Sequence, residues 1–96
     1  MIRLRGGVFM NKETIEKRKE FRMHLLINLY EHHFNNKGKD RYLRLKTEDV
    51  VADSETELAY TYLINKGFIK KRSTNSTLAF IISVDGIDFV ENHFVN

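Results

Sequence analysis

A long stretch without glycine or proline, from Lys12 to Asn35, constrains the fold of this chain more than any other feature. Nothing in the stretch interrupts a helix, so we expect one long helix there, or two helices with a bend. Its first part carries charges of opposite sign three and four residues apart, which favours a solvated helical face. Its second part, residues 21–34, is richer in apolar residues.

The apolar residues of this second part form two stripes on the predicted helix. One stripe contains Phe21, Leu25 and Leu29, and the other contains Met23, Leu26, Ile27, Tyr30 and Phe34. Together they span about 240° of the helix surface, whereas a surface helix needs an apolar arc of only ~100°. We therefore expect this helix to be covered on two sides, once by the core of its own chain and once by a second copy in a homodimer.

The length and composition indicate one small globular domain. The chain has 96 residues, of which 42% are hydrophobic and 30% are charged, as in ordinary globular proteins. It has no cysteine, which excludes disulfides, thiolate metal sites and a cysteine nucleophile. It lacks both an apolar run of the ~18 residues that a membrane span needs and the apolar segment of a secretory signal. We therefore expect a cytoplasmic protein without membrane contact.

The first ten residues differ from the rest of the chain. Arg5-Gly6-Gly7 can be encoded by a purine run that pairs with bacterial ribosomal RNA, and Met10 follows at a short distance. We therefore expect translation to start at Met10, so that residues 1–10 are an artefactual or disordered extension and residues 11–96 form the domain. Without Arg3 and Arg5 the basic residues fall from 16 to 14 against 13 acidic ones, and the net charge falls from +3 to +1. The net charge is then weak evidence for a nucleic-acid partner.

Beyond residue 35 the sequence predicts short elements separated by turns. A polar turn at residues 35–40 is followed by a strand (41–45), a helical turn (47–52), a helix (54–66), a strand (68–72), a polar loop (73–77), a strand (78–84) and a helix (86–94). Leu78, Phe80, Ile82 and Val84 alternate along the second strand of this hairpin. We therefore expect these four side chains on the face that lies against helices.

Polar residues mark the predicted helix starts. Thr47 is suited to cap the helical turn, because its hydroxyl can accept from the backbone of the first turn. Ser54 and Glu57 have the spacing of a capping box, and Asp85 is suited to cap the last helix. Gly67 supplies the left-handed residue that ends the helix before it.

This order of elements resembles the winged helix-turn-helix domain of small bacterial and phage transcriptional regulators. Residues 59–69 (AYTYLINKGFI) resemble a recognition helix that runs into the first wing strand, and residues 82–91 (ISVDGIDFVE) resemble the second wing strand turning into the closing helix. The segment 47–53 departs from the pattern, because it is short for the first helix of a helix-turn-helix. The resemblance implies an α+β winged-helix fold.

The resemblance also implies the orientation of the helix at residues 54–66. Thr56, Ala59, Tyr60 and Leu63 would face the core, and Glu57, Leu58, Thr61, Tyr62 and Asn65 would face outward. In the alternative orientation the helix is rotated, so that Tyr60 and Ile64 lie outside.

The function that the resemblance implies is sequence-specific binding of double-stranded DNA by a small regulator of transcription. In such domains the recognition helix enters the major groove and the hairpin contacts the backbone. Arg41 and Arg44 are suited to extend the backbone-binding surface. The residues implied to contact DNA are Glu57, Thr61, Tyr62, Asn65, Lys70, Lys71, Arg72, Thr74 and Asn75.

The acidic residues favour an alternative, a winged-helix protein-interaction module that does not bind DNA. Glu48, Asp49, Asp53, Glu55 and Glu57 crowd the two helices that would face the phosphates. Leu58 and Tyr62, one turn apart on the outward face, are typical of a contact with another protein. The basic run at residues 70–72 has an equally simple explanation as a charged edge strand that resists aggregation.

Neither a metal site nor an active site is expected. The four histidines, His24, His32, His33 and His93, have no spacing suited to zinc. His32 and His33 lie near a helix C-terminus, where the helix dipole favours the imidazolium form. The sequence has no glycine-rich phosphate loop and no spaced nucleophile and base. We therefore expect no cofactor and no enzymatic activity.

Overall fold

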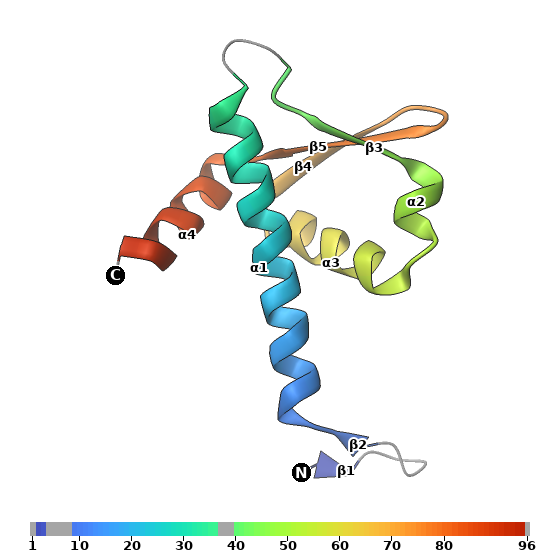
Figure 1. Cartoon of the computed structure of the whole chain (residues 1–96), viewed down its shortest axis with the longest axis vertical. Coiled ribbons are helices and arrows are strands. Elements are labelled where there is room, and N and C mark those ends of the chain that lie inside the picture. The colour runs from blue at the N-terminus through green and yellow to red at the C-terminus, as the bar shows by residue number, and fades with distance from the viewer. Residues whose placement is uncertain (1, 4–8, 37–39, 96) are drawn as a thin grey trace.

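The computed structural model of the chain describes residues 2–3, 9–36 and 40–95, and its architecture is α+β (Figure 1). The helices are α1 (Lys12–Asn35), α2 (Thr47–Val51), α3 (Ser54–Asn65) and α4 (Val84–Val95). The strands β3 (Leu43–Lys46), β4 (Ile69–Ser73) and β5 (Thr77–Ile82) form an antiparallel sheet. Two further short strands, β1 (Ile2–Arg3) and β2 (Phe9–Met10), pair with each other beside the start of α1.

The three-stranded sheet has the order β3-β5-β4, with β5 in the centre. On one side of β5, Leu43 pairs with Phe80 and Leu45 with Leu78, and on the other side Ile69 pairs with Ile82. The expected hairpin is therefore confirmed. Strand β4 lies one residue later than predicted, and β5 begins one residue earlier and ends two residues earlier than predicted. The first strand begins at Leu43 rather than at residue 41, because the Asp40 carboxylate accepts the Tyr42 backbone N–H and holds that segment in a turn. Part of the predicted turn, residues 37–39, lies outside the described residues.

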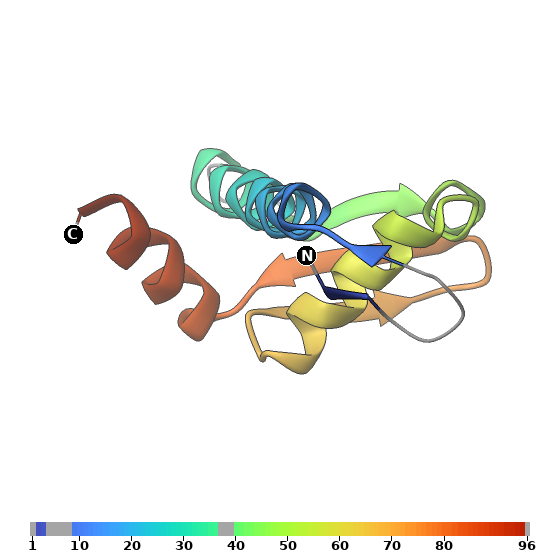
Figure 2. The same cartoon turned by 90° about the horizontal axis from the view of Figure 1, so that it is seen from below.

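The core lies between the inner face of the sheet and the helices α1 and α3. Seen from below, α3 lies in front of the sheet and α1 is seen end-on beside it (Figure 2). Phe80 of β5 is 1% exposed, and its ring stacks on Tyr60 of α3 at 4.1 Å and 5°. Leu78 and Ile82 join the same core, but Val84 does not: it opens α4 and is 73% exposed.

The burial of α3 decides its orientation. Ala59, Tyr60 and Leu63 are buried, and Thr56 is half-buried. The predicted orientation is thus confirmed, and the rotated alternative is wrong, because it would expose Tyr60.

Helix α1 is continuous from Lys12 to Asn35, as the absence of glycine and proline predicts. Both of its apolar stripes contact the same chain: Leu29 of one stripe and Leu26 of the other are each 1% exposed. Helix α4 packs against α1, and the Tyr30 hydroxyl donates to the Glu91 carboxylate at 2.8 Å. The chain itself therefore covers much of both stripes, and Phe34, 51% exposed, is left at the end of one of them.

The helix starts differ from the predicted caps at α2 and α4. Thr47 is the first residue of α2 rather than its cap, because its N–H bonds the Ser76 carbonyl at 3.0 Å and extends the pairing of the sheet. Helix α4 starts at Val84, ahead of Asp85. There the Ser83 hydroxyl donates to the Gly67 carbonyl at 2.6 Å and accepts the Gly86 N–H at 3.1 Å, so Ser83 takes the capping role.

Two glycines occupy positions where a larger residue would be strained or would clash. Gly67 has a φ of 79° and ends the turn after α3, as predicted. Gly86 lies where α4 approaches the start of β4: a Cβ atom there would lie 2.2 Å from the Phe68 carbonyl oxygen and 2.7 Å from an Ile82 side-chain carbon. This close approach allows the Phe68 and Phe89 rings to stack at 4.6 Å and ties α4 to the domain.

The expectation that the helix dipole favours the imidazolium form is wrong for His33. The pKa of His33 is lowered from its usual value, mainly by burial and further by the charges of Arg41 and His32. Arg41 donates to the His33 backbone carbonyl at the end of α1, so a cation already occupies the position that favours an imidazolium.

Candidate functional site

The exposed surface of α3 divides into two sides. Glu57, Thr61 and Asn65 are four residues apart and exposed, so they form one stripe, which we call the polar stripe. Leu58 and Tyr62 are 63% and 42% exposed and lie on a separate stripe. All five residues predicted to face outward are therefore exposed, but they belong to two surfaces of different chemistry.

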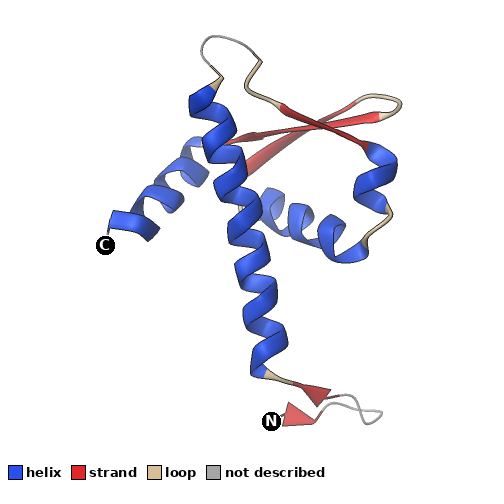
Figure 3. Cartoon of the chain, viewed as in Figure 1, coloured by secondary structure: helices blue, strands red, loops and turns tan. Residues whose placement is uncertain are grey.

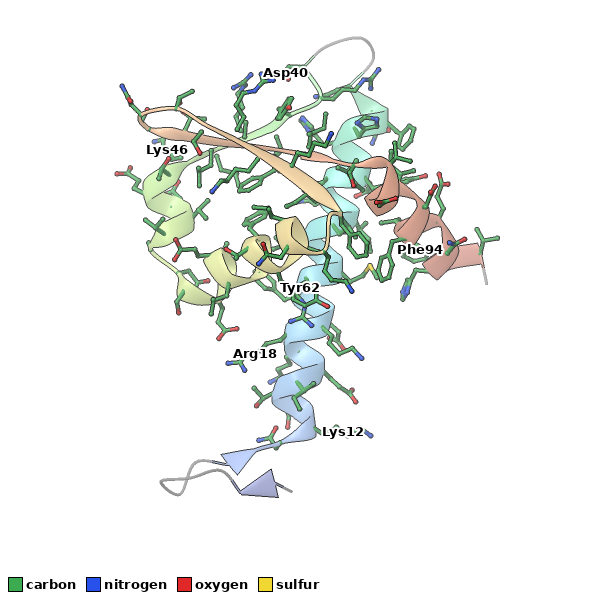
Figure 4. All side chains as sticks on the ribbon, turned by 180° about the vertical axis from the view of Figure 1, so that it is seen from behind. Lys12, Arg18, Asp40, Lys46, Tyr62 and Phe94 are labelled. Atoms are coloured by element: carbon green, nitrogen blue, oxygen red, sulfur yellow. The ribbon has the colours of Figure 1, made fainter. Side chains whose placement is uncertain are left out.

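The apolar side of α3 borders a groove against α1. The groove has a volume of about 320 Å³ and is lined by Arg18, Phe21, Arg22, Glu55, Leu58, Ala59 and Tyr62. The Arg22 guanidinium carbon lies 4.0 Å from the centre of the Tyr62 ring, which is the geometry of a cation–π contact. Figure 4 shows Tyr62 where α3 crosses α1, with Arg18 nearer the start of α1. Tyr62 is thus part of this groove rather than of the polar stripe.

Two of the five acidic residues on α2 and α3 are engaged within the chain. Asp53 is the N-cap of α3: its carboxylate accepts the Glu55 N–H at 3.3 Å and the Thr56 hydroxyl at 2.7 Å. Glu55 accepts two hydrogen bonds from Arg18, at 3.0 and 2.9 Å, and this contact raises the pKa of Arg18. Sequence reasoning missed the Arg18–Glu55 pair, because its members are 37 residues apart and no local pattern joins them.

The predicted capping box is therefore wrong in its first member. Asp53 and Ser54 are adjacent, and both are good N-cap residues, so local preference does not separate them. Asp53 takes the role because its backbone is extended, with φ −119° and ψ 111°, whereas Ser54 is already helical.

The basic run of the hairpin is split between the two faces of the sheet. Lys71 pairs with Phe80, so by the alternation of strands it shares the inner face, whereas Lys70 and Arg72 lie on the outer face. All three cations are exposed, and β4 is an edge strand. Thr74 and Asn75 lie in the exposed hairpin loop, where the Thr74 N–H donates to the Thr77 carbonyl at 2.9 Å.

Two kinds of feature are absent from the described residues, a cluster of metal ligands and a helix suited to span a membrane. Across residues 2–3, 9–36 and 40–95, no three histidine or acidic side chains gather where they could hold a metal ion. Among the same residues, none of the helices combines the length and the apolar character that crossing a bilayer requires.

Comparison of the chain with protein-family models, with curated proteins and with solved structures gives no significant match.

The capping role of Asp53 gives a direct test of how α3 begins. Replacing Asp53 with alanine should lower the free energy of unfolding by about 1 kcal/mol, because the first turn of α3 loses its hydrogen-bond acceptor. The S54A variant serves as the matched control and should change it by less than ~0.5 kcal/mol. Urea unfolding measures the free energy of unfolding of both variants. A larger loss of unfolding free energy in S54A than in D53A would show that Ser54, and not Asp53, is the N-cap.

Proposed function

We propose that this chain is a winged-helix domain that binds double-stranded DNA sequence-specifically, as a small cytoplasmic regulator of transcription. It acts by binding rather than by catalysis. The order of elements supports this proposal, as does a central β5 flanked by β3 and by the hairpin partner β4. The observation that carries it is the polar stripe, an exposed row of hydrogen-bonding side chains on a capped helix whose opposite side is buried.

The residues of the polar stripe have the chemistry of base readout. An asparagine can make two hydrogen bonds to adenine, and a threonine can bond several base edges, so Asn65 and Thr61 read neighbouring bases in the major groove. Glu57 accepts from a cytosine amine. Thr74 and Asn75 in the hairpin loop, with Lys71 on the inner face, contact the backbone and set the register.

Charge indicates which end of α3 lies nearest the DNA. Glu48, Asp49 and Asp53 lie on α2 and at the start of α3, where phosphates would be repelled. Thr61, Asn65 and the exposed Lys66 lie at the other end of the helix, away from these carboxylates. We therefore infer that the C-terminal half of α3 lies deepest in the groove, with Glu57 at the groove's edge. The pairing of Arg18 with Glu55 removes one of the repulsive charges.

A second candidate function, protein interaction, is favoured by one observation. Leu58 is 63% exposed at the edge of the α1–α3 groove, beside Tyr62. An exposed apolar pair on a helix next to a groove suits the apolar face of a partner protein.

Selection from a randomised library of duplexes tests the DNA proposal. The wild-type protein should enrich one sequence, and a T61A/N65A variant should bind the enriched duplex at least ~10-fold more weakly, because each lost base contact costs about 1–3 kcal/mol. An N92A variant, which removes an exposed asparagine from α4, should bind like the wild type. Selection that enriches no sequence, or an unchanged affinity of T61A/N65A, would contradict base readout by α3 and leave protein interaction as the better explanation.

We also propose that the domain is a homodimer through the side formed by α1 and α4. Phe34, Phe94 and Val95 are 51%, 65% and 83% exposed on these two helices. A second copy packed there would remove this apolar surface from water. The dimer would also present two α3 helices, one from each copy, to two half-sites on DNA.

Light scattering measures the oligomeric state. The wild-type protein should have the mass of two chains, and an F34S/F94S variant should have the mass of one. The L58S variant, which changes an equally exposed leucine on α3, should remain a dimer. A monomeric wild-type protein at high concentration would contradict the proposed dimer.

A further inference from the structure

The outer face of the three-stranded sheet carries two rows of cations. The pairing of Arg44 with Ala79 and of Arg72 with Ala79 places both arginines on the face opposite Phe80. Lys46, two residues after Arg44, and Lys70, two residues before Arg72, share that face by alternation. All four cations are exposed. Between the rows, β5 contributes only Thr77, Ala79 and Ile81. We call this surface the outer basic face.

This surface is separate from the site proposed on α3. Helix α3 packs against the inner face, through Tyr60 on Phe80, and Figure 3 shows α2 and α3 together on one side of the strands. The polar stripe and the outer basic face therefore lie on opposite sides of the sheet.

One of the cations is held in place by an aromatic ring. The Arg72 guanidinium carbon lies 4.5 Å from the centre of the Tyr42 ring, and Arg72 donates to the Tyr42 hydroxyl at 3.4 Å. Tyr42 precedes β3 and Arg72 lies on β4, so the arginine crosses over the central strand, and Ala79 there is only 1% exposed. An arginine held in this way loses less conformational freedom when it binds an anion.

Acidic residues near this surface are few. Asp40 accepts from Arg44 at 2.9 Å, and its pKa is lowered, first by the Tyr42 backbone N–H, then by Arg44, with a smaller effect from Arg72. Glu48 lies at the other end, beside Lys46 in a shallow hollow near the hairpin loop. Four cations against these two carboxylates leave the surface positive.

We propose that the outer basic face binds the phosphate backbone of double-stranded nucleic acid, independently of the polar stripe. Two rows of exposed cations match an anion whose charges repeat, whereas a single small anion would need an enclosed pocket. A lipid surface fits less well, because membrane-bound surfaces insert apolar side chains and the only large one between the rows, Ile81, is half-buried. With DNA also on α3, the domain would bridge two duplex segments.

The test measures the affinity for a duplex of arbitrary sequence as a function of salt. Each phosphate contact contributes about −0.9 to the slope of log affinity against log salt concentration. Four contacts therefore give an affinity loss of ~150-fold between about 50 and 200 mM salt, and two contacts give a loss of ~12-fold. The K46Q/K70Q variant should therefore bind more weakly and show a slope smaller by ~1.8. Among the described residues neither lysine forms an ion pair, so the fold should be preserved.

A control comes from α1. K12Q removes an exposed cation at the start of α1, away from the sheet (Figure 4), and should leave the affinity and the salt slope for this duplex unchanged. D40N should bind severalfold more tightly, because it removes the negative charge beside Arg44 while its carbonyl still accepts the Tyr42 N–H.

Three results would overturn the inference: K46Q/K70Q binds like the wild type, K12Q loses as much affinity as K46Q/K70Q, or vesicles containing phosphatidylserine bind while the duplex does not. The T61A/N65A variant separates this inference from the proposal for α3. It should lose sequence preference and keep the salt slope for the arbitrary duplex. If T61A/N65A abolishes all binding while K46Q/K70Q has no effect, the outer-face inference fails and base readout by α3 stands.

Discussion

The stacking of Tyr60 on Phe80 is the contact on which the rest of this structure depends. It joins α3 to the central strand, with both rings buried and nearly parallel. Because Tyr60 is held against the sheet, Thr61 and Asn65 must face solvent, and Leu58 and Tyr62 must turn toward α1. Because Phe80 faces α3, its partner Lys71 shares the inner face, while Lys70 and Arg72 face the other way. One aromatic contact thus determines which chemistry each surface presents.

The parts of the fold that depend on periodicity could be predicted from the sequence. Helix α1 and the hairpin follow from where apolar residues recur, since burial of apolar surface dominates folding. The orientation of α3 follows from the resemblance to winged-helix domains, because the apolar pattern by itself also allows the rotated alternative. The helix caps could not be predicted to the residue, because neighbours such as Asp53 and Ser54 are equally suited and tertiary contacts decide between them. The candidate site was predicted only as a set of exposed residues. Its division into two faces depends on strand register, and contacts such as Arg18–Glu55 or Arg72–Tyr42 join residues 37 and 30 positions apart.

The surfaces explain why the charge of this chain is a poor guide to its function. The net charge is small, but the charges are separated in space: carboxylates collect on α2 and at the start of α3, while four cations lie across the sheet on the outer face. Helix α3 therefore offers hydrogen bonds with little electrostatic attraction, and the outer face offers attraction with little specificity. Under the proposed function, these would be the two components of DNA recognition, sequence readout and backbone contact, on opposite sides of one sheet.

The most direct measurement is a duplex titration followed by the backbone amide resonances of the protein. If both surfaces bind DNA, two separate groups of amides should shift: Thr61 to Asn65 at the end of α3, and the segments around Arg44 to Lys46 and Lys70 to Arg72 on the outer face. The amides of α4 should stay unchanged apart from any effect of the dimer contact. Shifts confined to the groove lined by Phe21 and Leu58, or no shifts at all, would contradict DNA binding by this domain.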